Sequence, residues 1–296
     1  MTVFAIINPV SGAGADSNTA ERRVRMLREA AAHRGVEIEC HLTTRGGHAR
    51  ELAREALNAG AALVVAWGGD GTINEIGGEL LRTSTPLAVI PAGSGNGLAA
   101  ALALPRRPEA AIAAAFDGVE RVIDAGLMAG RPFFNLAGVG FDAHIARLFN
   151  ERPRGRRGKL PYVTIGVREG CTYCGADYTL TLDGVSRRLT ALLITFANGR
   201  EYGMGAKIAP QAQLDDGFLD AVVVEDRSVA ARFGGVPYLA FSAVQRASGV
   251  QISHIRQAVV ERDGPIEYHV DGEGARADGR VEVGIIPSAL RVRVPA

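Results

Sequence analysis

Three glycine-rich turns in the first third of the chain constrain its fold more than any other feature. Each turn directly follows a short apolar segment, and these segments are Val3–Asn8, Leu63–Trp67 and Leu87–Ile90. Helical periodicity over Thr19–Arg34 and Ala49–Asn58 alternates with these segments and with the strand-like Glu37–Thr43. This order of strands and helices predicts a parallel sheet with helices on both faces.

The glycine-rich turns are expected at the carboxyl ends of the parallel strands, where such sheets bind their ligands. Glycines let backbone N–H groups approach an anion closely, and a helix that begins there adds a positive dipole. The turns therefore predict a phosphate site. Asp70 fits such a site if Mg²⁺ lies between it and the phosphate, or if it takes a proton from an attacking hydroxyl.

Neither common nucleotide-binding fingerprint is present at these turns. The chain lacks the Walker A pattern G-x-x-x-x-G-K-[ST], and G-x-G-x-x-G does not follow the first strand. A glycine-rich turn with a capping Asp, Ser or Asn is the structural alternative for each segment taken alone.

After about Asp124, the pattern changes to short alternating segments separated by Gly, Pro and Asp-Gly turns. This pattern predicts a second, mostly antiparallel β domain. The expected strands are Phe133–Ala137, Tyr178–Leu182, Leu192–Asn198, Leu219–Val224, Ile266–Val270 and Val281–Ile286.

Composition narrows the class of protein. The 296 residues carry 33 basic and 32 acidic side chains, a balance that argues against nucleic acid as a partner. Three cysteines are too few for a disulfide scaffold and fit a reducing cytoplasm. No stretch approaches the ~20 apolar residues of a membrane span, so contact with a bilayer is expected to be peripheral.

Five motifs, NPVSG, GGDGTINE, PAGSGNGLA, LDDGFLD and VDGE, occur in that order between residues 8 and 273. The set resembles the diacylglycerol kinase catalytic family, which includes bacterial lipid kinases and the sphingosine and ceramide kinases. GGDGT by itself is shared with NAD kinases and phosphofructokinases.

The resemblance implies an N-terminal α/β domain of the NAD kinase/phosphofructokinase type over residues 1–124 and a C-terminal antiparallel β-sandwich domain over residues 125–286. The second domain is expected to take the lipid, with the site in the cleft between the two. A strand near residues 287–296 is a candidate to return to the first domain.

By resemblance, ATP is held by residues of the first domain, with Thr44 as an alternative to Thr43. The implied ATP-binding residues are Asn8, Pro9, Ser11, Gly12, Thr43, Gly68, Gly69, Asp70, Gly71, Thr72, Asn74, Glu75, Gly93, Ser94 and Asn96. Many bacterial members have Asp at the position of Gly97, whereas sphingosine kinases have a small residue there. This departure favours a long-chain base or another lipid alcohol over diacylglycerol.

The resemblance also implies a Mg²⁺ site important to structure, formed by the Asp216 side chain and backbone oxygens near Gln213 and Phe218. Without the resemblance, Asp215-Asp216-Gly217 is equally a hairpin turn. Glu273 is implied as general base and Asp271 as a second acid near Mg²⁺ and phosphate, with Asp70 competing for the role of base.

Two further sequence features are candidates for contact with the lipid and with the membrane. Asp142 is predicted either to bind a polar headgroup or to cap the helix that follows it. Arg152–Lys159 carries five positive charges in eight residues, which predicts either membrane docking or a solvated loop.

The sequence thus predicts a magnesium-dependent transferase, an ATP-dependent lipid kinase of phospholipid metabolism. It is expected to phosphorylate a diacylglycerol or sphingoid-type alcohol in the cytoplasm and transiently at the inner face of the membrane. An NAD kinase-like nucleotide kinase and a non-catalytic lipid or nucleotide sensor are the alternatives. A homodimer is left open.

Overall fold

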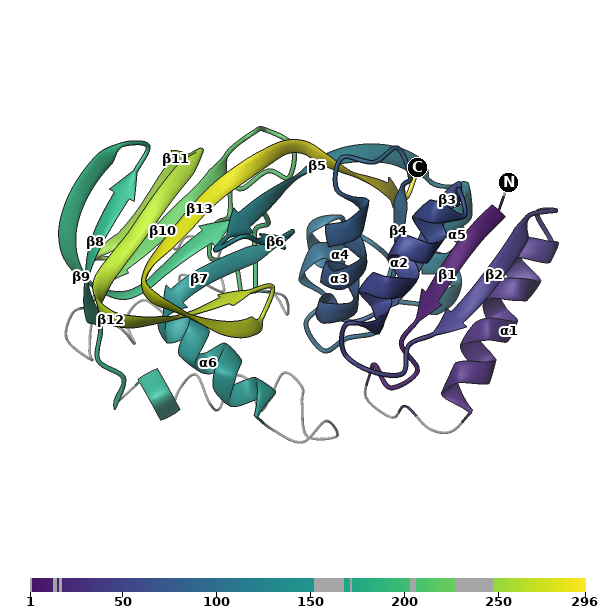
Figure 1. Cartoon of the computed structure of the whole chain (residues 1–296), viewed down its shortest axis with the longest axis horizontal. Helices are drawn as coiled ribbons and strands as arrows, with labels where there is room; N and C mark the ends of the chain where they lie inside the picture. Colours follow the sequence, from purple (N-terminus) through teal and green to yellow (C-terminus); the bar gives the residue numbers. More distant parts are fainter. Residues whose placement is uncertain are drawn as a thin grey trace. The chain divides into compact units, whose positions relative to one another are not determined.

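The structure, a computed structural model, describes residues 2–12, 15, 18–151, 168–170, 172–202, 206–226 and 247–296. The chain divides into two compact units (Figure 1). The first unit comprises Met1–Ile123 with Ser288–Ala296, and the second comprises Asp124–Pro287.

The first unit contains a parallel sheet and five helices in its described residues. The strands are β1 (Thr2–Ile7), β2 (Glu37–Leu42), β3 (Leu63–Gly68) and β4 (Leu87–Pro91). The helices are α1 (Thr19–Ala32), α2 (His48–Asn58), α3 (Asp70–Leu80), α4 (Gly97–Ala101) and α5 (Pro108–Asp117). The strand order is β13-β4-β3-β1-β2, and Val292 of β13 (Glu273–Val294) pairs with Leu87.

Apolar side chains cover both faces of this sheet. Leu27 of α1 and Ile112 of α5 pack in one cluster with alternate residues of β1, β3 and β4. Ile76 and Leu80 of α3 are fully buried, and α3 packs against β3, β4 and α2. Burial on both faces explains why β1, β3 and β4 are almost wholly apolar, whereas the edge strand β2 alternates exposed and half-buried residues. The parallel sheet with helices agrees with the prediction.

The second unit is built from antiparallel strands and one helix that the structure describes in full, α6 (Phe141–Asn150). The strands are β6 (Arg131–Phe133), β7 (Leu136–Gly140), β8 (Ala176–Leu182), β9 (Val185–Ala197), β10 (Leu219–Glu225), β11 (Val250–Ile255) and β12 (Gln257–Val270). The order along the main path is β11-β10-β9-β7-β12-β13, and β5 (Val119–Met128) pairs with β6 and β13.

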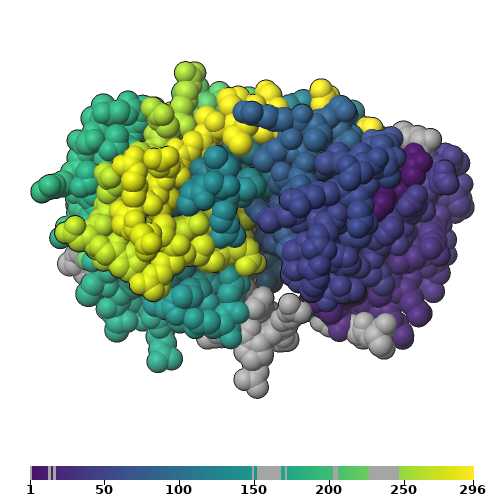
Figure 2. All heavy atoms as spheres, in the orientation of Figure 1, coloured from purple at the N-terminus to yellow at the C-terminus, as the bar shows by residue number. Residues whose placement is uncertain are grey.

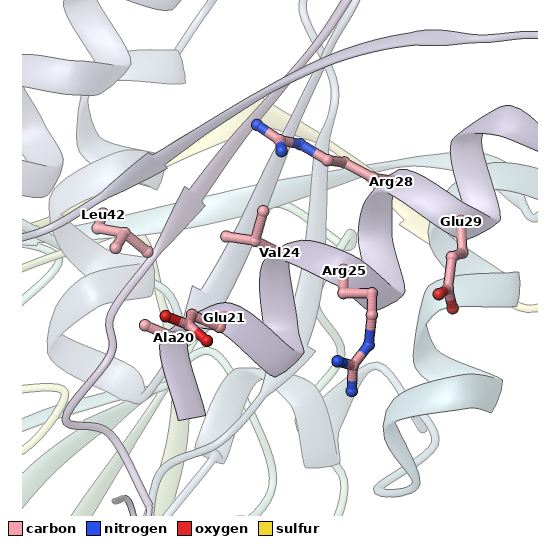
Figure 3. Close-up of a pocket in the computed structure, with 7 residues that line it drawn as sticks. All are labelled: Ala20, Glu21, Val24, Arg25, Arg28, Glu29 and Leu42. Carbon is pink, nitrogen blue, oxygen red and sulfur yellow. The ribbon is translucent and has the colours of Figure 1, made fainter. Parts of the chain in front are cut away.

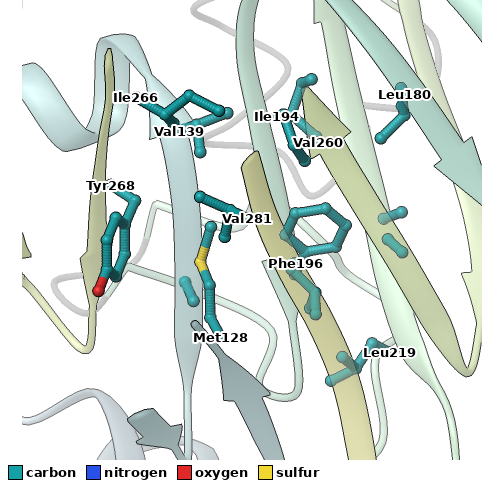
Figure 4. Packing of buried hydrophobic residues seen from close by; sticks show 14 of the residues in the cluster. Met128, Val139, Leu180, Ile194, Phe196, Leu219, Val260, Ile266, Tyr268 and Val281 are labelled. Carbon is teal, nitrogen blue, oxygen red and sulfur yellow. The ribbon is translucent and has the colours of Figure 1, made fainter. Parts of the chain in front are cut away.

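The core of the second unit is a continuous apolar cluster (Figure 4). Phe196, Met128 and Val281 are buried at its centre, and Tyr268 lies at its edge. In the space-filling view, atoms of β13 lie on the surface of this unit (Figure 2), as its alternation of half-buried and exposed residues requires.

Several strands are longer than the sequence pattern predicted. The strand predicted at Leu192–Asn198 begins at Val185. The prediction missed its first half because the residues there alternate between exposed and half-buried, and only the second half is fully buried. The strand predicted at Val281–Ile286 extends over Glu273–Val294 for the same reason. None of the helices in the described part of the chain combines the length and the apolar character that crossing a membrane requires.

Candidate active site

The three glycine-rich loops of the first unit are joined by backbone hydrogen bonds at the carboxyl ends of β1, β3 and β4. The amide of Asn8 donates to the Trp67 carbonyl at 2.9 Å, and the amide of Ala92 donates to the Gly68 carbonyl at 2.8 Å. The Asn8 side chain adds a third link, since its Nδ2 donates to Thr72 Oγ1 at 3.0 Å. These contacts bring the predicted phosphate loops together at one edge of the sheet.

Arg23 of α1, which sequence reasoning missed, fixes the loop after β1. Its guanidinium donates to the Asn8 carbonyl at 2.5 Å and to the carbonyl and Oγ of Ser11 at 2.8 and 2.9 Å. The same group lies 5.4 Å from the Trp67 ring centroid. Burial, with a smaller contribution from Arg22, lowers the pKa of Arg23, although an arginine remains charged in proteins. The loop therefore closes around a buried cation.

Asp70 ties the loop after β3 to the beginning of α4. Its Oδ2 accepts a hydrogen bond from the Asn96 amide at 2.8 Å, and its Oδ1 accepts one from the Gly97 amide at 2.7 Å. These amides lie at the amino end of α4, where backbone donors need partners outside the helix. Both oxygens thus serve an anchoring role, and Gly97 takes part through its backbone.

The loop after β4 packs backbone to backbone against the loop after β3. A Cβ atom on Gly93 would lie 2.7 Å from Gly69 Cα, so no larger residue fits without a shift. The Asn96 side chain closes the loop, because its Oδ1 accepts from the Gly93 amide and its Nδ2 donates to the Gly93 carbonyl, both at 2.7 Å. The glycines are therefore needed for loop packing as well as for any approach of a ligand.

The remaining predicted ATP residues surround these loops within the first unit. Thr43 is buried, and its amide donates to the Ile7 carbonyl at 2.9 Å. Glu75 Oε1 accepts from the Gly47 amide at 2.9 Å and so positions the start of α2. Ser94 and Gly12 are exposed, whereas Pro9, Ser11, Gly71 and Asn74 are half-buried.

A shallow hollow of about 380 Å³ lies on another part of this unit, beside α1 and the end of β2 (Figure 3). Val24 and Leu42 supply apolar surface there, and Arg25, Arg28 and Glu29 supply charge. None of the predicted site residues lines it.

In the second unit, Asp271 and Gly272 form the two-residue turn between β12 and β13. Their φ angles of 47° and 85° are both positive, as a type I′ hairpin turn requires. The Asp271 carboxylate accepts from the amides of Phe134 and Asn135 at 2.9 Å and of Leu136 at 3.2 Å. Asp271 therefore anchors the turn to the segment before β7.

Glu273, the first residue after this turn, is exposed. It lines a hollow of about 490 Å³ together with residues of α6 and of the β12–β13 hairpin, among them Arg147, Asn150 and Arg276. Within the described part of the chain, its carboxylate has no hydrogen-bond or ion-pair partner. Of the three predicted catalytic carboxylates, Glu273 is thus the one that remains available to a substrate.

Asp142 is only 5% exposed and lies in the first turn of α6. Its Oδ1 accepts from the Ala143 amide at 2.8 Å, and its Oδ2 accepts from Thr195 Oγ1 at 2.6 Å. This burial favours the predicted alternative in which Asp142 serves the start of the helix over direct contact with a lipid headgroup.

The predicted metal segment adjoins a buried carboxylate, that of Asp220. Asp216 Oδ1 accepts from the Phe218 amide at 3.0 Å. Asp220 is 3% exposed, and among the described residues neither of its carboxylate oxygens has a hydrogen-bond partner, although His254 Nδ1 lies 3.1 Å from one of them. Burial raises the pKa of Asp220, the nearby His254 lowers it in part, and the charge of Asp216 adds a smaller upward contribution.

A divalent cation on Asp216 would relieve this concentration of negative charge, so the residues present fit the predicted site. The described residues contain no group of three or more His, Cys, Asp or Glu side chains that could hold a metal ion. The basic segment Arg152–Lys159 lies outside the described residues.

Comparison with protein-family models matches the two parts of the chain separately. Residues 2–128 match the diacylglycerol kinase catalytic domain. Residues 135–294 match the YegS C-terminal NAD kinase beta sandwich-like domain. The chain belongs to the YegS/diacylglycerol kinase family. Both the resemblance and the predicted fold class, an α/β domain followed by a β-sandwich domain, are confirmed.

Curated relatives of this YegS/diacylglycerol kinase family member carry lipid kinase names. A Pseudomonas aeruginosa protein named "Probable lipid kinase YegS-like" is 31% identical over 92% of this chain and 90% of its own length. A Mycobacterium tuberculosis protein named "Diacylglycerol kinase" is 31% identical over 99% of this chain and 95% of its own. These names agree with the predicted class, a phosphotransferase with an alcohol acceptor.

Solved structures share the fold of this family member. The crystal structure of a diacylglycerol kinase from Bacillus anthracis str. Sterne covers 99% of this chain and 96% of its own, with a TM-score of 0.73 at 19% identity. Another structure from the same organism covers 99% and 95%, with a TM-score of 0.81 at 22% identity.

Proposed function

We propose that the chain transfers the γ-phosphoryl group of ATP to a hydroxyl group of a lipid. The observation that carries the proposal is the exposed Glu273 carboxylate, which lines a hollow and has no partner among the described residues. An alcohol hardly ionises at neutral pH, so its attack on phosphorus requires a group that takes its proton. Glu273 supplies that group, and the lipid kinase names of the relatives indicate the class of acceptor.

The first unit binds ATP through the loops after β1, β3 and β4. Their backbone N–H groups and the amino end of α3 favour phosphate. Asp70 and Arg23 act as positioning residues there, since Asp70 holds the loop after β3 to the start of α4 and Arg23 holds the loop after β1 to α1. Mg²⁺, when bound with ATP, supplies neutralisation of the phosphate charge.

The loop packing leads to a prediction for Gly93. Replacing Gly93 with Ala should weaken ATP binding and lower stability by about 1–3 kcal/mol, because overpacking moves the surrounding backbone. The added Cβ would lie 2.7 Å from Gly69 Cα and 2.9 Å from Asn96 Oδ1. Gly46→Ala is the matched control, since a Cβ there meets no atom within 4 Å. Isothermal titration with ATP and thermal denaturation measure both effects, and equal behaviour of the two variants would refute this role of Gly93.

A structural Mg²⁺ at Asp216 forms part of the proposal. MgCl₂ should raise the melting temperature of the wild type. At a hundredfold excess over Kd, the free energy of unfolding should rise by about 2.7 kcal/mol. The Asp216→Asn variant should lose this effect. Asp215→Asn is the control, because that neighbouring carboxylate is exposed and is not a proposed ligand. A magnesium response that survives in Asp216→Asn would remove the proposed ligand.

The acceptor that the protein phosphorylates distinguishes a lipid kinase from a soluble nucleotide kinase and from a non-catalytic sensor. Purified protein is incubated with ATP and either NAD or a panel of diacylglycerol, sphingosine, ceramide and prenol-type alcohols, and ADP release is recorded. The proposal expects ADP release with at least one lipid and none with NAD. Turnover with NAD would indicate a soluble nucleotide kinase, and ATP binding without ADP release would indicate a sensor.

The enzyme is further proposed to reach its lipid from the cytoplasm, at the inner face of the membrane. The five basic residues of Arg152–Lys159 are the proposed contact. Reversing these charges should reduce co-flotation with anionic vesicles, since each basic residue contributes about 1 kcal/mol near such a surface. Unchanged flotation would exclude this segment.

A further inference from the structure

A row of three residues crosses the second unit beneath α6. His269 of β12 pairs with Gly138 of β7, and Gly138 pairs with Thr195 of β9. The three positions therefore lie side by side on one face of the sheet, and α6 packs over these strands. His269 and Thr195 are buried, at 3% and 0% exposure.

The Asp142 carboxylate, carried by α6, occupies the space above Gly138. A Cβ on Gly138 would lie 2.3 Å from Asp142 Oδ2, so only glycine leaves room for the carboxylate. The same oxygen accepts from Thr195 Oγ1 at 2.6 Å and lies 3.2 Å from His269 Nε2. His269 Nε2 and Asp142 Oδ2 are not aligned for a hydrogen bond. At 3.2 Å they are still close enough to interact electrostatically. The row thus has a buried negative charge at its centre.

His269 connects this buried charge to the turn that carries Glu273. Its Nδ1 accepts a hydrogen bond from the Gly272 amide at 3.3 Å. A ring nitrogen that accepts carries no proton, so the neutral ring has its proton on Nε2, the nitrogen that faces Asp142. The negative charge of Asp142 beside Nε2 favours this same tautomer electrostatically, the one whose other nitrogen can hold the turn.

Gly272 is held through its carbonyl as well as through its amide. Asn150 Nδ2, from the last turn of α6, donates to the Gly272 carbonyl at 2.7 Å. Together with the Asp271 carboxylate, these contacts leave the turn little freedom, although its one functional side chain, Glu273, is exposed. Rigid support for an exposed carboxylate is what a positioned proton acceptor requires.

We propose that His269 is a positioning residue that, oriented by Asp142, fixes the Asp271–Gly272 turn and thereby the Glu273 carboxylate. The inference rests on the proposed function, because it assigns Glu273 as the group that takes the proton. His269 itself touches no reacting atom in this scheme. It sets the place of the carboxylate through the Gly272 amide.

Two substitutions separate the contacts of the ring. His269→Asn places an oxygen near the position of Nδ1 and keeps an acceptor for the Gly272 amide. His269→Gln places its amide near the position of Nε2 and keeps the contact with Asp142 but loses the acceptor. We expect His269→Asn to retain kcat within about threefold and His269→Gln to lose roughly tenfold to a hundredfold, the usual effect of removing an outer-shell orienting contact. KM for ATP should be unchanged in both.

Hydrogen exchange of the turn gives a readout that does not depend on activity. The amides of residues 271–273 should exchange as slowly in His269→Asn as in the wild type and at least about tenfold faster in His269→Gln. The proposal would be overturned if the two variants had equal exchange rates and equal kcat, or if both quantities simply followed the melting temperatures of the variants. Either result would leave a purely structural histidine. If His269→Gln does not fold, a large loss of kcat in folded His269→Asn overturns it. A wild type that phosphorylates no lipid would refute the proposed function while the exchange result still decides the role of His269.

Discussion

Glu273→Gln should lower kcat by about 10²- to 10⁴-fold, because the amide cannot take the proton from the attacking hydroxyl. The side chain is exposed and its carboxylate has no partner among the described residues, so stability should stay within about 0.5 kcal/mol of the wild type. ATP binding should be unchanged, because the proposed ATP loops belong to the other unit. Steady-state kinetics, isothermal titration and thermal denaturation measure the three quantities.

Glu267→Gln is the matched control for this substitution. Glu267 lines the same hollow and is also exposed, but it lies 3.5 Å from Arg147 in an ion pair. Its loss should change kcat by less than about threefold, since an exposed ion pair contributes at most about 1 kcal/mol. If Glu273→Gln retained wild-type kcat, or if both variants lost activity equally, Glu273 would not be the proton acceptor.

Asp70→Asn should have the largest effect on ATP binding. The carboxylate accepts from the amides of Asn96 and Gly97, and the asparagine side chain can accept only from one of them while its NH₂ group faces the other donor. Breaking one hydrogen bond to a charged group costs about 1.5–3 kcal/mol. We therefore expect lower stability together with weaker ATP binding, measured by denaturant unfolding and by titration with ATP.

This result also separates the two roles predicted for Asp70. An anchor predicts loss of stability and of ATP affinity, whereas a general base predicts loss of kcat with both retained. Glu79→Gln, at the other end of α3, is the control, since it removes only the ion pairs with Arg50 and Arg54. A stable Asp70→Asn protein that binds ATP normally and fails only in turnover would make Asp70 the base and contradict the assignment of Glu273.

The fold class could be predicted because its signals are local. The buried strands β3 and β4 of the first unit are uninterrupted apolar runs that end at glycine and proline, and Asp271-Gly272 is a sequence typical of a type I′ turn. The partly exposed ends of β9 and β13 escaped prediction, because half-buried strands lack such runs.

The site was predicted less completely, because carboxylates of the same kind turn out to have different partners. Sequence placed Asp70, Asp271 and Glu273 together as acids. Only the structure separates the two anchors from Glu273, whose carboxylate has no partner among the residues that the structure describes. Arg23 offered a usable signal, since it shares the i, i+4 spacing of buried Leu27 and Ala31 on α1.

His269 offered no such signal. Alternation places it on the face opposite Tyr268 and Val270, which a strand pattern alone assigns to solvent. It is buried because α6 covers that face, and the pairing of β12 with β7 and β9 cannot be deduced from one segment.

Transfer of label from ATP to lipid tests the central claim most directly. The purified protein is incubated with Mg²⁺, γ-labelled ATP and a cell lipid extract, with Glu273→Gln as the parallel sample, and the labelled product is identified by mass. The account predicts label in the monophosphate ester of a lipid alcohol with the wild type and at least about a hundredfold less with the variant. Label that stays in the aqueous phase with the wild type, as inorganic phosphate or on a soluble nucleotide, would contradict it.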